Sequence, residues 1–386
     1  MDVKVLEGSG GVLPDIRPQW DRCVAGAPGH QKLFGHAWYA VWMKHIGSAG
    51  RWTGETRILL AYDDRGELRG ILPLARQLML RLPIWSLPGY YQPVRGFVCH
   101  DEVRVDVCAA FARTLLASQG LMEIIRLGPT DDATPERAAL VEELSRRCQR
   151  VVVFHDDHRI VAHDIPRSAA AYREMVHGHA SMKRVLSYER RMQREGMAEI
   201  RHHRDPRGDE LRAMLEACAE VERRSWLSSS RSGQPRFVSD ASRGFWRDLC
   251  TEQLGPQGQL DAWLVHFDGQ PIAFRFSLTA GSTRFLIANQ YDERFAQYRA
   301  GWILYLRDLE DCAARGVTSI DMGEGDAHYK SRWGGERGAR SIDVVVLPPG
   351  PAGVLGAKLM TVESINRRAR FMRPGWGRTA GPAAAQ

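Results

Sequence analysis

Residues 260–302, LDAWLVHFDGQPIAFRFSLTAGSTRFLIANQYDERFAQYRAGW, contain the pattern that decides the fold. Three stretches rich in β-branched and aromatic residues, 260–267, 271–279 and 283–291, predict strands. Asp268-Gly269 is typical of a two-residue turn joining the first two strands in a hairpin. A polar loop then leads into a periodic apolar stretch, so the sequence predicts three consecutive strands followed by a helix.

The residues that follow continue the alternation of strands and helices. The helix is expected over 301–315 and to end at Gly316, since glycine favours the helix C-terminus. A short strand over 319–322, a glycine-rich segment over 323–335 and a strand over 341–347 come next. The second half is therefore predicted to be a mixed α/β structure.

The N-terminal half has a similar order of elements. It contains a predicted hairpin over 57–74, helices over 107–119 and 136–149, and a strand over 122–127. Each half thus has a hairpin, a helix and a strand in the same order, and residues 150–165 are a plausible junction between two domains. The middle of the chain is predicted to be helical. These helices are expected over 172–194, 209–227 and 242–252, and the first is basic.

Length and composition exclude several classes of protein. The 386 residues correspond to about two to three domains, and 44% of them are hydrophobic, so a coiled coil or a disulfide knot is excluded. No apolar run reaches the ~18–20 residues that a membrane-spanning helix needs. The N-terminus MDVKVLEGSG lacks the features of a signal peptide, so a cytoplasmic location is expected.

The arginine content of the chain has two interpretations, and its cysteine spacing argues against disulfides and a zinc site. The net charge is +7, and only six of the 53 basic residues are lysine. This arginine bias could reflect genomic base composition or phosphate binding by guanidinium groups. None of the seven cysteines forms a C-x-x-C pair, and the sequence shows no zinc-ligand spacing, so reduced thiols and no metal are expected.

The order of elements over 260–347 resembles the GNAT acyltransferase core. More specifically, the chain resembles the tandem-GNAT branch associated with bacterial cellulose and exopolysaccharide biosynthesis, which is related to the Fem-type aminoacyltransferases. The motifs of this resemblance are FGHAW at 34–38, GILPL at 70–74, SMKR at 181–184, Glu222 with Trp226, DGQP at 268–271, and Asp321-x-Gly323 with the segment YKSRWG at 329–334.

This resemblance implies two tandem GNAT-like α/β domains and an enzyme. The expected boundaries are 1–155 for the first domain and 156–373 for a second domain with the donor-binding groove, followed by a disordered tail over 374–386. The family transfers an acyl group from acyl-CoA to an amine by direct attack, without a covalent enzyme intermediate and without a metal.

The donor loop is expected at Gln297, Arg299, Ala300, Gly301 and Trp302. GNAT enzymes have the form Gln/Arg-x-x-Gly-x-Gly/Ala here, whereas this chain has alanine and the bulky tryptophan at the two small positions. The N–H groups at the start of the following helix and its dipole favour phosphate, and the arginine adds positive charge. An ordinary strand-to-helix turn is the alternative interpretation.

The acceptor side is expected in the segment after the strand at 319–322. Tyr329 is the candidate acid for the leaving thiolate, Asp326 and Glu324 are candidate bases, and His328 and Lys330 are candidate substrate ligands. A solvated loop with a packed tyrosine is the alternative. Further candidate substrate ligands are Glu222, Trp226 and Tyr291, although the glutamate could instead pair with a neighbouring arginine.

Three functions remain open at this point. The first is an acyl-CoA-dependent N-acyltransferase that acts on a small amine, an amino sugar or an amino acid. The second is a Fem-like transferase that uses aminoacyl-tRNA, in which the basic helix and the arginines of 366–378 bind the RNA backbone. The third is a non-catalytic scaffold in polysaccharide export, favoured by Trp302 in the donor loop. Oligomeric state, acceptor and acyl chain do not follow from the sequence.

Overall fold

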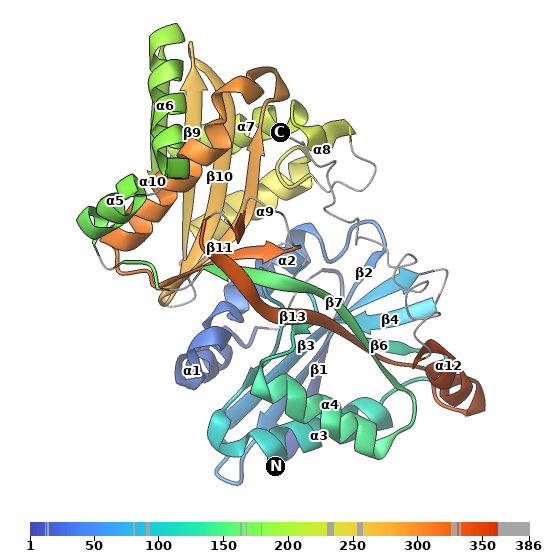
Figure 1. Cartoon of the computed structure of the whole chain (residues 1–386). Coiled ribbons are helices and arrows are strands. Elements are labelled where there is room, and N and C mark those ends of the chain that lie inside the picture. Colours follow the sequence, from blue (N-terminus) through green and yellow to red (C-terminus); the bar gives the residue numbers. More distant parts are fainter. Residues whose placement is uncertain are drawn as a thin grey trace. The chain divides into compact units, whose positions relative to one another are not determined.

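The computed structural model of the chain shows a mixed α/β protein (Figure 1). It describes residues 1–11, 13, 15–79, 82–89, 93–162, 164–166, 168–178, 180–229, 235–252, 258–325, 330–331 and 333–361. Contacts within the chain divide it into two compact units. The described residues before 159 and after 338 form unit 1, and those from 159 to 338 form unit 2.

Unit 1 contains the N-terminal elements and the last strand and helix of the described chain. In order these are β1 (Asp2–Gly8), α1 (Arg17–Gly26), η1 (Gly29–Leu33), α2 (His36–His45), β2 (Trp52–Tyr62), β3 (Leu68–Met79), β4 (Leu82–Ser86), β5 (Val98–Cys99), η2 (Asp101–Val103), α3 (Arg104–Ala117), β6 (Ile124–Asp131), α4 (Pro135–Arg147), β7 (Val151–Ala162), β13 (Gly335–Val346) and α12 (Pro351–Thr361). Two of these strands, β7 and β13, also include residues of unit 2.

Unit 2 contains the elements between those two strands. In order these are α5 (Ala169–Gly178), α6 (Ala180–Glu195), β8 (Ala198–Arg204), α7 (Gly208–Arg223), α8 (Trp226–Ser229), α9 (Asp240–Thr251), β9 (Gln259–Phe267), β10 (Gln270–Ala280), β11 (Thr283–Tyr291), η4 (Glu293–Tyr298), α10 (Ala300–Ala314) and β12 (Ser319–Glu324).

The sheet of unit 2 has the strand order β12-β11-β10-β9-β8. Neighbouring strands from β8 to β11 are antiparallel, whereas β11 and β12 are parallel because α10 connects them. The predicted hairpin turn is confirmed, since Asp268 and Gly269 have φ angles of 49° and 78°, as a type I′ turn requires. The three predicted strands and the predicted helix of this region are confirmed, with α10 beginning one residue early, at Ala300.

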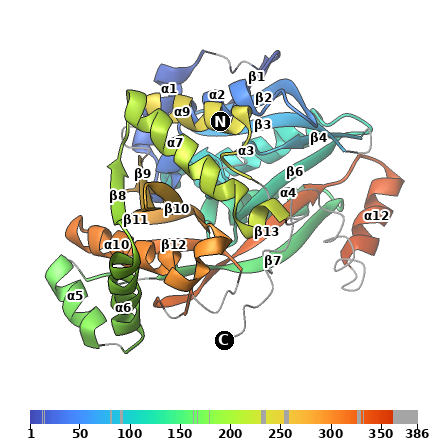
Figure 2. The same ribbon diagram turned by 90° about the horizontal axis from the view of Figure 1, so that it is seen from above.

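Helices cover both faces of this sheet. On one face α10 packs against β9, β10 and β11, and α5 and α6 pack against α10 (Figures 1 and 2). On the other face α7 contacts β10 and β11 and packs against α9 (Figure 2). Phe237 and Trp246 contact Phe276 there through edge-on rings. Helix α10 is therefore held between the sheet on one side and α5 and α6 on the other.

The strands of unit 1 include a comparable connection. Strand β4 pairs with β6 in parallel, from Ile84 opposite Ile124 to Ser86 opposite Arg126, and α3 lies between them in the sequence. This repeats the order β11, α10, β12 of unit 2. One face of the sheet packs on α3 and α4 through a core that includes Phe111.

The structure differs from the sequence prediction at several boundaries. The predicted helix over 172–194 is two helices, α5 and α6, and α5 ends at Gly178, a residue with low helix propensity. Helix α7 ends at Arg223 because the Ser225 hydroxyl donates to the Glu222 carbonyl and competes with the helical bond. Strand β13 begins at Gly335, six residues before the predicted start. The sequence prediction did not identify β1, α1, β7 and α12.

Candidate active site

Strands β11 and β12 pair over a short distance. The parallel pairing runs from Thr283 opposite Ser319 to Phe285 opposite Asp321, although β11 continues to Tyr291. In the described chain the pairing with β12 stops there, so alternate backbone N–H and C=O groups of 286–291 on that side have no β12 partner. An extended ligand could use these groups as it would use a missing strand.

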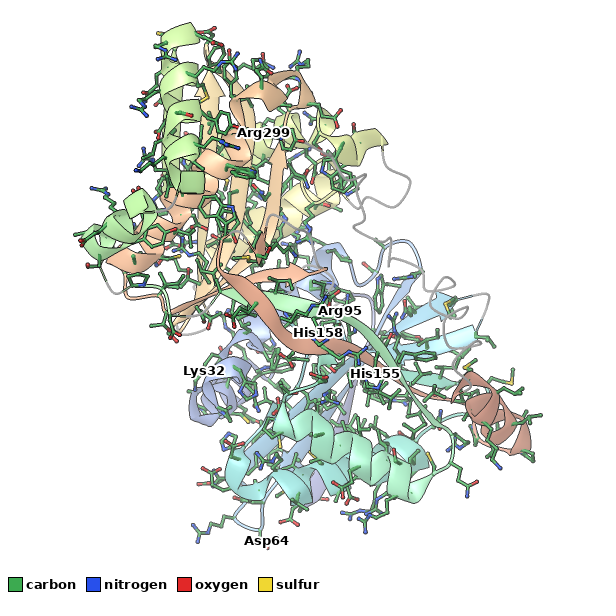
Figure 3. All side chains as sticks on the ribbon, in the orientation of Figure 1. Lys32, Asp64, Arg95, His155, His158 and Arg299 are labelled. Carbon is green, nitrogen blue, oxygen red and sulfur yellow. The ribbon has the colours of Figure 1, made fainter. Side chains whose placement is uncertain are left out.

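Helix α10 begins beside this unpaired part of β11. Arg299 (labelled in Figure 3) adopts the left-handed conformation with φ 50° directly before the helix. Both Arg299 and Gln297 are exposed. Ala300 is buried. The first N–H groups of a helix have no acceptor within it, and the dipole adds positive potential, so this end of α10 can bind an anion.

Asn289 lies next to this helix start and was not identified from the sequence. A Cβ atom added at Gly301 would lie 3.7 Å from its Oδ1 atom and 3.8 Å from its Nδ2 atom. That Oδ1 atom is buried and has no hydrogen-bond partner among the groups that the structure describes. Buried polar atoms usually have a partner, so this atom is suited to a ligand. In the sequence, the two polar residues at 289–290 directly follow an apolar run, and this pattern could have indicated Asn289 as a site residue.

Trp302, the departure from the GNAT loop pattern, contributes to packing. Its ring contacts Trp333 edge-on at 6.2 Å between centroids, and Trp333 in turn stacks on Tyr305 at 4.7 Å. Trp302 is partly buried against the core of unit 2. The bulky side chain therefore anchors the first turn of α10 to the segment before β13.

The end of β12 is held by a buried ion pair. Arg159 donates two hydrogen bonds to Asp321, at 2.7 and 2.8 Å, and lies 3.9 Å from Glu324. Asp321 also accepts the N–H of Gly323 at 2.8 Å, and the φ of 76° at that glycine explains the Asp-x-Gly motif. Arg159 is 162 residues from its partner, and no local pattern indicated it.

Lys330 fixes the next turn rather than projecting into solvent. It is buried, and its Nζ donates to the carbonyl oxygens of Gly323, Glu324 and Gly325 at 2.7–3.1 Å. Glu324 is partly exposed at the end of β12. The other predicted residues of this segment, Asp326, His328 and Tyr329, lie outside the described residues.

Glu222 anchors a loop. Its carboxylate accepts the backbone N–H groups of Arg236, Phe237 and Val238 at 2.7–3.1 Å. Burial raises the pKa of Glu222, while these three hydrogen bonds act in the opposite direction. Arg236 in turn donates to the Ile287 carbonyl of β11. The glutamate thus positions the loop beside the unpaired part of β11.

Two further predicted ligands lie at element ends. Trp226 is the partly buried first residue of α8, three residues beyond the end of α7. Tyr291 is the exposed last residue of β11, beyond the part that pairs with β12. Tyr291 therefore lies near the part of β11 that does not pair with β12.

Helix α6 places positive charge beside the donor loop. It packs against η4 and α10, and the Arg191 guanidinium lies 5.8 Å from the ring of Tyr298. Arg191 pairs with Glu195 at 2.8 Å. The exposed cations of α6 are Lys183, Arg184, Arg190, Arg191 and Arg194.

Metal and thiol chemistry have no evident site in the described part of the chain. Within it, no group of three or more His, Cys, Asp or Glu side chains is arranged to bind a metal. All seven cysteines are free thiols, and burial raises the pKa of Cys23 and of Cys250 to about 12. No described helix is both long enough and apolar enough to cross a membrane.

Comparisons with known proteins agree with this geometry. Residues 180–331, all within unit 2, match the family described as "Acetyltransferase (GNAT) domain". A comparison with curated protein sequences finds no significant match.

Several solved structures have a similar fold at low sequence identity. FemX aligns over 90% of this chain and 97% of its own, with a TM-score of 0.53 and 11% identity. L-PGS from Bacillus licheniformis aligns over 94% and 99%, with a TM-score of 0.51 and 11% identity. A tandem GNAT protein from the clavulanic acid biosynthesis pathway aligns over 91% and 100%, with a TM-score of 0.50 and 12% identity.

The chain therefore contains a GNAT acetyltransferase domain within a GNAT-like α/β fold. In unit 2 the parallel strands β11 and β12 pair over three residues, and helix α10 connects them in the sequence. The protein is an acyltransferase.

Proposed function

We propose that the protein transfers an acyl group from acyl-CoA to the amine of a small molecule, an amino sugar or an amino acid. The observation that supports this most is the start of α10 beside the unpaired part of β11. The helix N-terminus suits the donor's phosphates, and the unpaired backbone suits its extended, amide-containing arm. Gly301 leaves room beside Asn289, whose buried Oδ1 atom can accept a hydrogen bond from that arm.

The donor groove is proposed to belong to the second domain, 156–373. In unit 1 the helix in the corresponding position, α3, is preceded by Asp101 and Glu102 and has Asp106 in its first turn. These carboxylates repel the phosphates that the helix dipole would attract. No acidic residue lies in the first turn of α10.

The reaction proposed is direct attack. The amine nitrogen attacks the thioester carbonyl carbon, the N–C bond forms and the C–S bond breaks. The proton lost by the amine passes to Glu324, Asp326 or His328, and Tyr329 donates a proton to the leaving thiolate. Backbone N–H groups between Ala288 and Gln290 are the proposed donors to the oxyanion. Acyl-CoA is a cytoplasmic metabolite, so the proposal places the reaction in the cytoplasm.

Aminoacyl-tRNA is the second candidate donor, and helix α6 is the observation that favours it. Lys183, Arg190 and Arg194 are spaced by seven and four residues, so they share one exposed stripe about 16 Å long. This stripe could bind the phosphates of an RNA backbone next to the donor loop. The Fem-type resemblance of the sequence supports this alternative, while the resemblance to the exopolysaccharide branch supports an amino-sugar acceptor.

Donor binding distinguishes the two candidates. Thermal shift is measured with CoA, a panel of acyl-CoA thioesters and bulk tRNA, each at low and at high salt. For an acyl-CoA enzyme we expect stabilisation by the thioesters with a weak salt dependence, and thiol release on adding an amine. If only tRNA raises the Tm, and this increase falls steeply with salt, aminoacyl-tRNA would be favoured as the donor. No stabilisation and no turnover with either donor would support the non-catalytic scaffold.

A matched pair of variants locates the site. Arg190→Gln combined with Arg194→Gln should weaken tRNA binding and lower its salt dependence by about two phosphate contacts if that donor is correct. The same variant should leave acyl-CoA binding within about twofold, because these exposed side chains are not part of the proposed donor loop. Arg212→Gln is the control, since its side chain is exposed on α7 and pairs with an exposed Asp209.

A further inference from the structure

Helix α12 of unit 1 has one buried and one exposed face. Ala357 packs with Val152, Phe154 and Leu347 in a small apolar core. A Cβ atom added at Gly353 would collide with the Pro348 carbonyl, so the helix lies close to the preceding turn on that side. The opposite face exposes two large apolar side chains. Leu355 is 59% exposed and Leu359 is 50% exposed.

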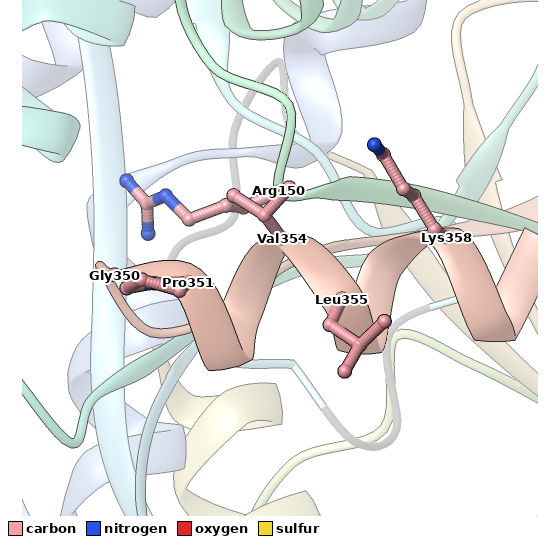
Figure 4. Close-up of a pocket in the computed structure, with 6 residues that line it drawn as sticks. All are labelled: Arg150, Gly350, Pro351, Val354, Leu355 and Lys358. Atoms are coloured by element: carbon pink, nitrogen blue, oxygen red, sulfur yellow. The ribbon is translucent and has the colours of Figure 1, made fainter.

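A shallow pocket lies along this exposed face. Its volume is about 420 Å³, and its walls combine two cationic side chains with apolar ones (Figure 4). It is lined by Arg150, Gly350, Pro351, Val354, Leu355 and Lys358. Such a combination suits a ligand with an anionic group joined to an apolar chain.

A second group of exposed apolar side chains follows Gln119, which is hydrogen-bonded to the segment before α12. Gln119 donates to the carbonyl oxygens of Val346 and Leu347, at the end of β13, and accepts a hydrogen bond from Arg150 at 2.8 Å. The turn that follows Gln119 exposes Leu121 by 79% and Met122 by 62%. Four of the most exposed large apolar side chains of the described chain thus belong to two connected segments.

Basic residues outnumber acidic ones in α12 and in the sequence that follows it. Helix α12 contains Lys358 and no acidic residue. The sequence that follows it, 362–386, contains five arginines and one glutamate, together with Phe371 and Trp376. Apolar side chains that enter the headgroup region and basic side chains that attract anionic lipids are the two components of peripheral membrane binding.

We propose that the α12 surface, formed by Arg150, Leu355, Lys358, Leu359 and the turn at 121–122, binds a bilayer of anionic phospholipids. The pocket beside Arg150 and Lys358 takes a lipid phosphate, and the leucines enter the boundary of the acyl region. This surface attaches the acyltransferase to a membrane without a spanning helix. It is independent of the donor proposed above.

Vesicle co-sedimentation with the full-length protein tests this proposal. The probes are phosphatidylcholine vesicles and vesicles that contain phosphatidylglycerol as the anionic lipid. We expect binding to the anionic vesicles alone, falling with added salt. Leu355→Ser combined with Leu359→Ser should lower the partition coefficient at least tenfold, and Lys358→Gln should lower it about fivefold.

Matched controls use exposed residues elsewhere on the chain. Met197→Ser removes an apolar side chain that is 78% exposed in unit 2, and Lys4→Gln removes an exposed lysine of β1. Neither should change the partition coefficient more than about twofold, and all variants should keep parental donor binding and thermal stability.

Three results would overturn the proposal. The first is equal binding of the leucine double variant and the parent to anionic vesicles. The second is binding to RNA by Lys358 and the following arginines with no vesicle binding. The third is a dimer that the leucine double variant converts to a monomer while neither form binds vesicles, because the exposed face would then be covered by a second copy.

Discussion

Replacement of Asp308 by asparagine tests how α10 is held on its sheet. Asp308 accepts hydrogen bonds from Arg275 of β10 and Arg284 of β11, and all three side chains are fully buried. Arg284 also donates to Asp261 at 3.2 Å and to Asp311 at 3.0 Å. The variant keeps the shape of the side chain and removes the charge that both guanidinium groups face.

The expected loss of stability is large. Removing one partner of a buried ion pair costs about 3–5 kcal/mol, because a buried charge is left uncompensated. For a unit of this size one kcal/mol lowers Tm by about 2–4 °C, so Asp308→Asn should lower it by about 6–20 °C. Asp240→Asn is the control and should change Tm by no more than about 2 °C, since its carboxylate is 96% exposed.

The difference between parent and variant should depend on pH. Burial alone would raise the pKa of Asp308, but the attraction of Arg284 and Arg275 outweighs it and the pKa lies below its ordinary value. A carboxylate with a lowered folded-state pKa stabilises the protein above its unfolded-state pKa of about 3.9, and this contribution is lost as pH falls through the folded-state pKa. The Tm difference should therefore be constant near neutral pH and shrink in acid.

Scanning calorimetry of the two variants and the parent at pH 7 and pH 3 measures both quantities. A Tm of Asp308→Asn within about 2 °C of the parental Tm at pH 7 would refute the reasoning. It would show that the charges of Arg275 and Arg284 are balanced by other groups when Asp308 is neutral. A Tm difference that grows in acid would refute the assigned direction of the pKa shift.

Three further predictions concern the candidate site. Arg299→Ala should weaken donor binding by about 1–3 kcal/mol in calorimetric titration and leave acceptor affinity unchanged, and equal donor affinity would remove Arg299 from the site. Glu222→Ala leaves the N–H groups of 236–238 without their acceptor and should cost about 3 kcal/mol or more in denaturant unfolding, whereas an unchanged midpoint would show that the loop is held by other contacts. Tyr329→Phe should lower kcat at least tenfold with donor affinity and Tm near parental values. Parental turnover with chemistry rate-limiting would assign the proton to another group.

The sequence by itself determined the elements whose physical cause is local. Stretches rich in β-branched and aromatic residues on both sides of Asp268-Gly269 predicted a hairpin, and the φ angles of the turn agree with it. The helix that follows the third strand ends at Ala314, and Gly316 follows its C-terminus with a φ of 71° that suits glycine. The GNAT-like order of elements in this half followed from these local patterns.

Helix and strand ends without a local determinant were harder to predict. Helix α7 had the periodicity to continue, but a serine side chain bonded to a helical carbonyl instead. Strand β13 begins in a glycine- and arginine-rich stretch without alternation, and it lies between β6 and β7 in the strand order, so pairing with neighbouring strands determines its extent. These limits depend on tertiary partners, which a local pattern does not contain.

The tertiary structure alone decided what the charged residues of the site do. Glu222 was expected either at the substrate or paired with an adjacent arginine, yet it binds backbone N–H groups 14–16 residues away. Arg159 meets Asp321 across 162 residues, and Lys330 turns back onto the carbonyls before it. Asn289 became a candidate ligand only beside Gly301. A charged or polar side chain can satisfy its bonds with any nearby partner, and which partner is near is set by the packing of the sheet and its helices rather than by position along the chain.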